Sequence, residues 1–451
     1  MQKVAEFLER NLPAKDKALA HTAYDAFFTF AFSPNSTSKN GVHVRDGMDL
    51  KRLMVHVVIG LQLLYLFGTY NIGHQHFVAL GEHTGLFEAI NLKLAYGLIK
   101  LIPIFVVANV VGLAIEFYYA AKKGHSVEEG YLVTGALIPL IMPPDIPLWI
   151  LSVSIVFAVV IGKEAFGGTG MNVFNIALLA RVFIFFAYPT TISGDQVWVA
   201  GFDTADGLAP GATVGDYGGF INGWWIWPGL NGIFEGLGWP AFDQAATVVD
   251  GYTGATPLGL AYEGGWERVT EVYTAGQMLW GTIPGSIGGS SKVFILFGLL
   301  LLLVTGIASW RITFSVFGGA AVVAMLLNLW GATPFMEVAW YNQFLMGSLL
   351  FAAVYMATDP VTASSTNTGK YIYGAGIGAI GMIIRVANPA YPEGWMLSIL
   401  FMNAFAPLID HYVVEGNMKR RARRLLERGK SVDARPAPSG AGEPAAQPAA
   451  A

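Results

Sequence analysis

Long apolar runs separated by short polar connections dominate the hydrophobic pattern of the chain. Several runs approach the roughly 20 residues that an α-helix needs to cross the hydrocarbon of a membrane. The pattern predicts ten spanning helices, in two groups of five on either side of a long polar stretch at 190–292. The expected spans are 53–72, 98–121, 131–144, 147–162, 172–189, 293–310, 312–331, 341–358, 371–388 and 395–414.

The expected fold class is all-α, a polytopic membrane protein with about ten transmembrane helices. Two groups of five spans must have opposite orientations in the membrane, which predicts two inverted five-helix repeats. A short internal similarity between Met171-Asn-Val-Phe and Met402-Asn-Ala-Phe agrees with a repeat. Prolines between 139 and 147 interrupt the third and fourth spans. Such a break marks either a transport site or a tight turn between tilted helices.

Composition agrees with membrane embedding and limits the possible chemistry. Only 13% of the 451 residues are charged, whereas soluble proteins usually carry about 25%. Mean hydropathy is +0.50. The chain has no cysteine, which excludes disulfides, thiolate-held iron–sulfur clusters and covalently attached c-type haem in this chain. A net charge of −4 does not identify partners, and we expect no nucleic acid among them.

Basic residues set the expected orientation. Cations at Lys51 and Arg52 precede the first span and a basic cluster at 419–424 follows the last, so the positive-inside rule places both termini in the cytoplasm. The sequence then divides into a cytoplasmic N-terminal segment at 1–52, a first transmembrane half at 53–189, a periplasmic loop at 190–292, a second transmembrane half at 293–416, and a basic, then disordered, cytoplasmic tail at 417–451.

The polar stretch contains the motif Asp250-Gly-Tyr-Thr-Gly-Ala-Thr256. These residue types also make ordinary turns, because Asp accepts hydrogen bonds from backbone amides and Gly adopts positive φ. Small neighbours, Gly254 and Ala255, would leave the Thr256 hydroxyl open to a bulky modifying group. The spacing resembles the site at which a flavin transferase links FMN, through its phosphate, to threonine. A second candidate, Gly211-Ala-Thr213, matches less well because its preceding acid is one residue too far away.

Further blocks, in order along almost the whole chain, resemble one family of membrane proteins. This family contains the B subunit of the sodium-translocating NADH:quinone oxidoreductase and the D subunit of the related Rnf complex. The blocks are His43-Val-Arg-Asp, Gly162-Lys-Glu-Ala-Phe-Gly-Gly-Thr-Gly170, Phe185-Phe-Ala-Tyr-Pro189, Ile283-Pro-Gly-Ser-Ile-Gly288, Gly306-Ile-Ala-Ser-Trp-Arg311, Met356-Ala-Thr-Asp359 and Arg385-Val-Ala-Asn-Pro. The chain departs from the family pattern at Ile176, at Gly289 and in a Trp-rich insertion at about 200–249.

The resemblance implies a membrane component of a multi-subunit redox pump in the bacterial inner membrane. The protein would carry covalent FMN and non-covalent riboflavin and pass electrons from NADH, oxidised on another subunit, to ubiquinone, with outward sodium transport. Its partners would be the other subunits, a flavin transferase for maturation, membrane lipid and ubiquinone. Two alternatives remain: the Rnf-type D subunit of a ferredoxin:NAD oxidoreductase, and a flavin-free small-solute channel of the same architecture.

The resemblance also assigns the cofactor residues. Thr256 would carry the FMN, and Asp250 and Gly254 would be recognition elements for the transferase. Asn172 and Asn175 match a pair that contacts riboflavin, although Asn is also a favoured helix N-cap.

One glycine and three acids complete the expected sites. Gly112 matches a glycine of the quinone region, although glycine in a membrane helix more often permits close packing. Glu116, Asp359 and Asp410 lie inside or at the ends of expected spans, where an ionisable group is costly and a functional site is the default hypothesis. The resemblance places these acids on the sodium pathway. The alternatives are pairing with an arginine (Arg181 or Arg385) or an exposed helix end.

Overall fold

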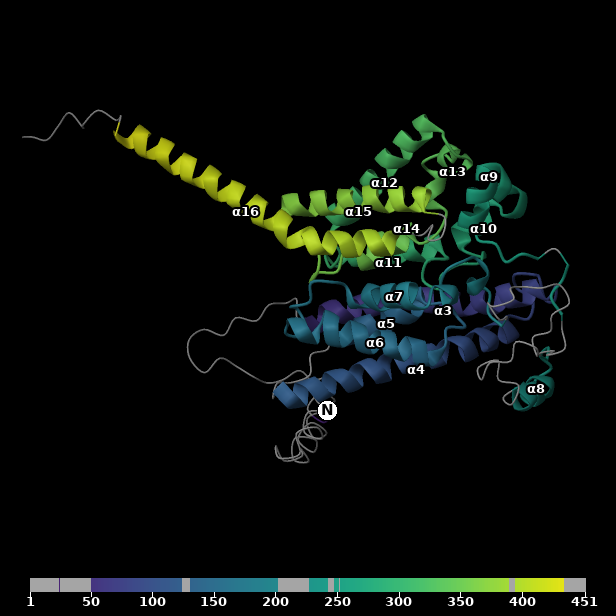
Figure 1. Ribbon diagram of the computed structural model, residues 1–451. Coiled ribbons are helices and arrows are strands. Elements are labelled where there is room, and N and C mark those ends of the chain that lie inside the picture. Colours follow the sequence, from purple (N-terminus) through teal and green to yellow (C-terminus); the bar gives the residue numbers. More distant parts are fainter. Residues whose placement is uncertain are drawn as a thin grey trace, which may run out of the picture.

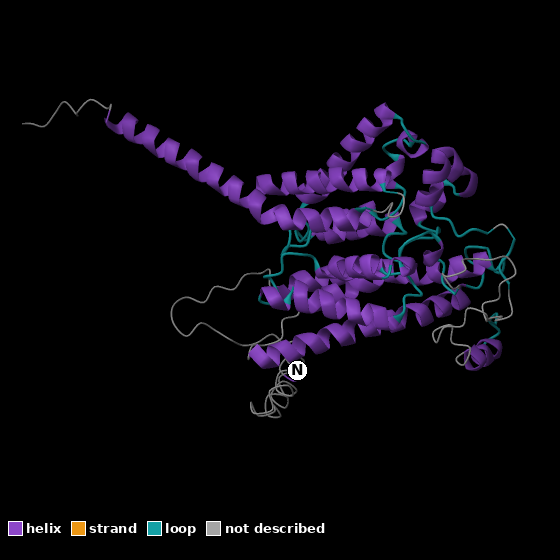
Figure 2. Ribbon diagram, viewed as in Figure 1, coloured by secondary structure: helices purple, strands orange, loops and turns teal. Residues whose placement is uncertain are grey.

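The computed structural model describes residues 50–123, 130–201, 227–241, 247–250, 252–388 and 394–433, together with Tyr24. These residues form helices and loops without any strand (Figure 2), which confirms the all-α prediction for this part of the chain. The N-terminal segment up to 49, most of the Trp-rich insertion with Thr213, and the end of the tail from 434 lie outside the described residues, and the predictions for them stay predictions.

The helices fall into two halves that lie side by side (Figure 1). The first half consists of α3 (Leu50–Ala79), α4 (Ile90–Lys123), α5 (Tyr131–Ile141), α6 (Leu148–Gly162) and α7 (Ile176–Ala187). The second half consists of α11 (Lys292–Val304), α12 (Trp310–Trp330), α14 (Leu349–Phe351) with a π-helical turn η5 (Ala352–Met356), α15 (Asn367–Ala387) and α16 (Trp395–Asp433).

The lengths and composition of these helices make the chain a multi-pass membrane protein. Five helical segments of the described chain are long and apolar enough to cross a membrane. They are α3, α4, α12, α16 and the segment that begins with α6. Three shorter apolar helices, α5, α7 and α11, accompany them. Each of the ten expected spans contains helical residues in the structure.

The two halves share several helix contacts, although the extensive contact of α3 with α4 in the first half has no comparable counterpart between α11 and α12. In the first half, α4 contacts α5 and α6, α6 contacts α7, and α5 contacts α3 and α7. In the second half, α12 contacts η5 and α15, α15 contacts α16, and η5 contacts α11 and α16. The halves meet through equivalent members, α3 with α11 and α7 with α16. This repeated packing agrees with the predicted repeat.

Glycines allow the closest helix crossings. A Cβ added at Gly73 or Gly97 would overlap a backbone oxygen across the α3–α4 crossing, and one added at Gly319 or Gly378 would do the same between α12 and α15. Helices in a membrane gain little from the hydrophobic effect, because lipid tails are as apolar as their side chains, so close backbone contact is an important source of packing energy. The same device serves both halves.

Element boundaries differ from the hydropathy prediction where polar residues are buried in protein. α3 continues to Ala79 through Asn71 and His76, which are buried, and α4 begins at Ile90 before the buried Lys93. A hydropathy pattern treats such residues as aqueous, although other helices surround them here. α16 also continues to Asp433, well past the expected end at 414, since a helix does not have to stop where the membrane does.

Two further segments differ from the prediction of one continuous span at 341–358 and a loop at 190–292. The span expected at 341–358 is a 3₁₀ turn (Asn342–Phe344), α14 and η5 in succession. The described part of the polar stretch contains the α-helices α8 (Trp227–Gly236), α9 (Pro257–Val272) and α10 (Ala275–Trp280) rather than loop alone. With α13 (Pro334–Glu337), α9 and α10 cover the end of the bundle opposite to the projecting end of α16 (Figure 1).

We predict that Gly97→Leu destabilises the protein by about 1–3 kcal/mol, because the added side chain separates α3 from α4. The measurement is the free energy of unfolding of the purified chain in detergent micelles. Gly318→Leu in α12 is the matched control, since a Cβ at Gly318 meets no atom within 4 Å. Equal stability of the two variants would contradict the proposed role of the glycine crossing.

Candidate functional site

Thr256 starts helix α9 and caps it. Its side chain accepts a hydrogen bond from the backbone N–H of Gly259 at 3.2 Å. Pro257 follows at the first helical position, where its fixed φ suits a helix start. Gly254, with a φ of +62°, supplies the left-handed turn that leads the chain into the cap. The sequence Gly-Ala-Thr-Pro therefore determines where the Thr256 side chain lies.

A carboxylate from a distant loop meets the Thr256 hydroxyl. Thr256 Oγ1 donates to Asp195 Oδ1 at 2.5 Å, and Asp195 lies 61 residues earlier, in the loop after α7. Burial raises the pKa of Asp195, and the nearby charge of Glu263 adds to this, while the hydrogen bonds from Thr256 oppose it. Sequence reasoning missed Asp195, because no motif links it to Thr256 and only the folded chain brings them together.

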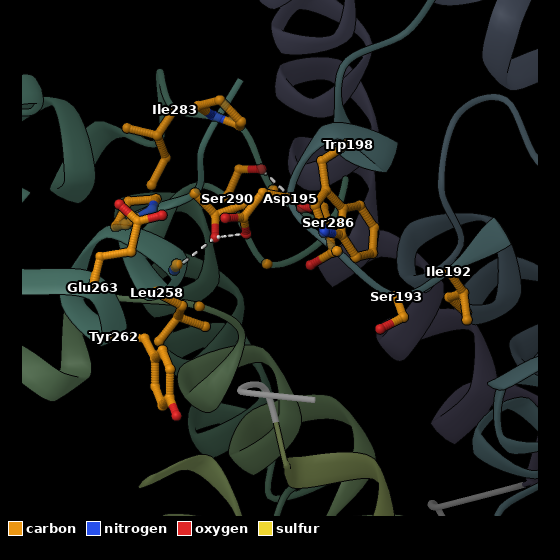
Figure 3. Close-up of a pocket in the computed structure, with 18 of the residues that line it drawn as sticks. Ile192, Ser193, Asp195, Trp198, Leu258, Tyr262, Glu263, Ile283, Ser286 and Ser290 are labelled. Carbon is orange, nitrogen blue, oxygen red and sulfur yellow. Dashed lines mark hydrogen bonds between the residues drawn. The ribbon is translucent and has the colours of Figure 1, made fainter. Parts of the chain in front are cut away.

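Thr256 and Asp195 line a cavity of about 270 Å³ at the α9 end of the molecule (Figure 3). Two cations also line the cavity, Arg181, which the sequence suggested only as a possible partner of a membrane acid, and Lys292, which sequence reasoning did not single out. Arg181 is buried and lies 5.6 Å from the Trp198 ring. The Lys292 ammonium is also buried and donates to three backbone oxygens, those of Gly289, Ser290 and Gly347, at 2.7, 3.1 and 2.9 Å. A hydroxyl beside buried positive charge can hold a phosphate group.

Of the residues assigned to the flavin motif, Thr256 lines this cavity, whereas Asp250 and Gly254 do not. Ser286 and Ser290 lie near Asp195 on the same wall (Figure 3). Asp250 is exposed, and neither Asp250 nor Gly254 lines the cavity. These positions agree with a recognition role outside the pocket rather than with contact to a cofactor.

A second, smaller cavity of about 80 Å³ lies between the two halves and brings several predicted residues together. Asn172, Asn175 and Asp359 all line it. Asn175 caps α7 by accepting from the Leu178 N–H at 3.2 Å, so the capping role weighed from sequence is present. Its Nδ2 also donates to Asp359 Oδ2 at 3.2 Å, which links α7 to the segment after η5.

The two other predicted acids do not line this cavity and have different environments. Glu116 pairs with Lys163, which lines the cavity, and both side chains are buried, with 5% and 6% of their surface exposed. Asp410 accepts hydrogen bonds from Ser364 Oγ and Thr366 Oγ1 at 2.6 and 2.5 Å, and also from two backbone amides at the start of α15. Within the described chain, no group of three or more His, Cys, Asp or Glu side chains could hold a metal ion.

Gly112 has the packing role that was weighed as its alternative. A Cβ at Gly112 would overlap the ring of Tyr131, which belongs to α5. The Tyr131 hydroxyl donates at 2.7 Å to the backbone oxygen of Ala108, which lies in α4 with Gly112. Gly112 lines none of the three cavities described here. One helical turn earlier, Asn109 lines a mainly apolar cavity of about 860 Å³ formed by α3, α4 and α5.

Asp145 is a further polar site that sequence reasoning missed. Asp145 follows α5, the third helix of the first half. In the second half, Asp359 follows α14 and η5, which take the same place in the helix order. Asp145 pairs with Lys100 at 2.5 Å and accepts from the Gly201 N–H at 2.6 Å. The signal was present in the sequence, because Met142-Pro-Pro-Asp145 and Met356-Ala-Thr-Asp359 share one spacing.

We predict that Glu116→Ala destabilises the protein by about 3–5 kcal/mol, because it leaves the Lys163 ammonium buried without this carboxylate. The double variant Glu116→Leu with Lys163→Met removes both charges and is expected to be clearly more stable than the single variant. The free energy of unfolding in detergent measures both. A double variant no more stable than Glu116→Ala would show that the pair does not act as a unit.

Comparison with known proteins gives a consistent picture. A model of the NQR2, RnfD, RnfE family matches residues 37–419. The chain is 41% identical over 423 residues to the B subunit of the Na⁺-translocating NADH-quinone reductase of Chromohalobacter salexigens, with 90% of this chain and 91% of the relative covered. Proteins of the same name from Ectopseudomonas mendocina and Stutzerimonas stutzeri are 40% and 39% identical, with 90% of this chain and 94% of each relative covered.

Proposed function

The chain belongs to the NQR2, RnfD, RnfE family, and we propose that it is the membrane component of an NADH:quinone oxidoreductase that carries flavin and couples electron transfer to sodium transport. The names of the relatives favour this function over that of the Rnf D subunit. One observation carries the flavin part of the proposal: Thr256, which is itself buried, lines the same cavity as two buried cations, Arg181 and Lys292.

Thr256 is the proposed attachment point of FMN. A phosphate on Thr256 Oγ1 would lie at the N-terminus of α9, where backbone N–H groups and the helix dipole favour an anion. Arg181 and Lys292, on the same cavity, add positive charge. The residues present therefore fit the phosphate of the group, whereas a cavity of about 270 Å³ is smaller than the roughly 300–1,000 Å³ that encloses a ligand, so the flavin ring would extend beyond it. When bound, FMN supplies one- and two-electron transfer, and the chain fixes its position and environment.

Asn172 and Asn175 are the proposed contacts of riboflavin. Amide groups can donate to and accept from the edge of an isoalloxazine. A cavity of about 80 Å³ is nevertheless much smaller than the roughly 300–1,000 Å³ that encloses a ligand of this size. The described residues of this chain therefore do not fit a complete riboflavin. We propose that a neighbouring protein of the complex supplies the rest of the site.

The quinone is proposed to bind near α4. Gly112 itself is covered by Tyr131, so it acts by letting α4 and α5 approach. The neighbouring cavity of about 860 Å³ is large enough for a ligand and mainly apolar, as a site for a prenylated quinone must be. Asn109 and Gln62 supply amide groups in a mainly apolar lining that also includes Tyr65 and Thr69.

Asp359 and Glu116 are the proposed sodium-pathway residues with the better geometry. Asp359 lines the cavity between the halves, and Glu116 reaches its edge through Lys163. Asp410 is engaged by four donors at the start of α15. Asp359 also accepts from three donors, Asn175 Nδ2, the Val361 N–H and Thr362 Oγ1, but it lines the cavity, which Asp410 does not. We therefore propose a positioning role for Asp410, in which it holds the loop that contains Asp359.

The proposed setting follows from charge and from the relatives. Both termini would lie in the cytoplasm of a bacterial inner membrane, with Thr256 on the outer side. We propose the same division of the chain into segments as the sequence predicts. Helices α8, α9 and α10 would belong to the outer region at 190–292. Partners would be the other subunits of the complex, a flavin transferase, lipid and quinone.

We predict that Thr256→Val abolishes covalent flavin, because valine keeps the shape of threonine but has no oxygen to esterify. Ultraviolet fluorescence of the denatured polypeptide in a gel and the intact mass both measure the modification. Thr253→Val, in the same motif and more exposed, is the control and should stay fluorescent. A wild-type chain without flavin, made beside an active transferase, would favour the flavin-free channel.

We predict that Asn172→Ala removes most of the non-covalent flavin from the purified complex while α7 stays capped. Asn175→Ala should also lower stability by about 1 kcal/mol, because it removes the cap. Flavin released on denaturation and the thermal unfolding midpoint separate the two effects. Retention of full riboflavin by both variants would place that cofactor elsewhere.

A further inference from the structure

The contact between Thr256 and Asp195 has a chemical consequence beyond loop packing. The hydroxyl of Thr256 donates to Asp195 Oδ1 at 2.5 Å and accepts from the Gly259 N–H. Its proton is therefore already directed at a carboxylate, and the amide on the other side helps to fix the position of the oxygen. Thr256 lines the cavity, which is the side from which a phosphorus atom would approach Oγ1.

A threonine hydroxyl is a weak nucleophile and is usually activated by an adjacent general base. The charged groups that share the cavity with Thr256 are Asp195, Glu263, Arg181 and Lys292. The two cations cannot accept a proton. Among the described contacts of Thr256 Oγ1, the carboxylate of Asp195 is the acceptor of its proton, and Glu263 makes no such contact.

We propose that Asp195 is the general base for modification of Thr256, accepting the Oγ1 proton as the FMN phosphoester forms. The inference rests on the proposed attachment of FMN to Thr256. The protein would then contribute a catalytic residue to its own maturation, and the transferase would deliver and orient the flavin donor.

The step balances with an activated donor. Free FMN would have to lose water to esterify threonine, so the donor is taken to be a flavin dinucleotide with a pyrophosphate bridge. The Oγ1–phosphorus bond forms as the bond from that phosphorus to the bridging oxygen breaks, and the nucleoside monophosphate leaves with the bridging oxygen. The Oγ1 proton moves to Asp195 Oδ1, and no electron is transferred to or from the flavin.

The surroundings of Asp195 suit a group that takes up a proton. Burial raises the pKa of its carboxyl, so the carboxylate is a stronger base than an exposed aspartate. A protonated Asp195 could then donate to the new phosphate, whereas a charged carboxylate at that position would repel it.

The contact also explains why one threonine of the motif would be modified and not the other. Thr253 is the more exposed of the two. In the described part of the chain, its side-chain oxygen accepts from the Ala255 N–H at 3.4 Å and contacts no carboxylate. Exposure alone would favour Thr253, and a neighbouring carboxylate is one feature that distinguishes Thr256 from it.

The test is the rate of flavin attachment to the full chain, purified in detergent from cells without flavin transferase. The chain is incubated with purified flavin transferase and flavin adenine dinucleotide, and attachment is followed by intact mass and gel fluorescence. Asp195→Asn keeps an oxygen that can accept a hydrogen bond from Thr256 but cannot take its proton. We expect it to be slower by about 100-fold or more, the usual contribution of a general base.

A second variant, Gly259→Ala, is designed to displace the Asp195 carboxylate without replacing Asp195 itself. A Cβ at Gly259 would overlap the Asp195 carboxylate, so Gly259→Ala should displace Asp195 and also slow attachment. Glu267→Gln in α9 and Gly276→Ala in α10 are the matched controls, because Glu267 is exposed and a Cβ at Gly276 has no contact closer than 4.0 Å. Both controls should react at the wild-type rate.

The outcomes separate the two proposals. If the wild-type chain gains FMN on Thr256 and Asp195→Asn gains it equally fast, the role of Asp195 is wrong while the proposed function stands. If the wild-type chain gains none with an active transferase, both are overturned. If Asp195→Asn does not fold, as judged by its thermal unfolding, the Gly259→Ala rate decides: a slow rate supports the inference and a wild-type rate overturns it.

Discussion

Helix ends that lie inside or against an apolar bundle must have their backbone groups satisfied by protein, because lipid offers no hydrogen bonds. This constraint determines where the polar residues of the chain are found. Asn175 caps α7, Thr256 caps α9, and Asp410 accepts from the amides at the start of α15. The candidate functional residues are thus largely the residues that complete interrupted helices.

The same constraint links structure to chemistry in both halves. Asp145 and Asp359 each follow the interrupted third helix of their half. Asp145 takes a backbone amide and a lysine as partners, whereas Asp359 takes Asn175 from the other half. The aspartate at this place in the helix order therefore forms an ion pair with Lys100 in the first half, whereas in the second half it accepts a hydrogen bond from a residue of the other half. A two-fold arrangement of helices does not require two-fold chemistry.

The Thr256 cavity differs from the cavity between the halves in what the chain supplies. At Thr256, a hydroxyl, a carboxylate and two buried cations come from separate parts of the sequence, and the cations are the groups that suit a phosphate. Between the halves, amides and a carboxylate share a small space, which suits part of a ligand or a cation in transit. This division agrees with one tethered cofactor and one site that a neighbouring protein completes.

The sequence by itself determined the helical class, the approximate positions of the apolar segments and the local turn at Thr256, because hydropathy, proline and capping residues act over a few neighbours. It also determined the cap at Asn175. Only the tertiary structure decided that Asp195 meets Thr256, that Lys163 pairs with Glu116 and that Asn175 reaches Asp359. These contacts join residues 47 to 184 positions apart, and their partners follow from how the helices cross, which no local pattern specifies.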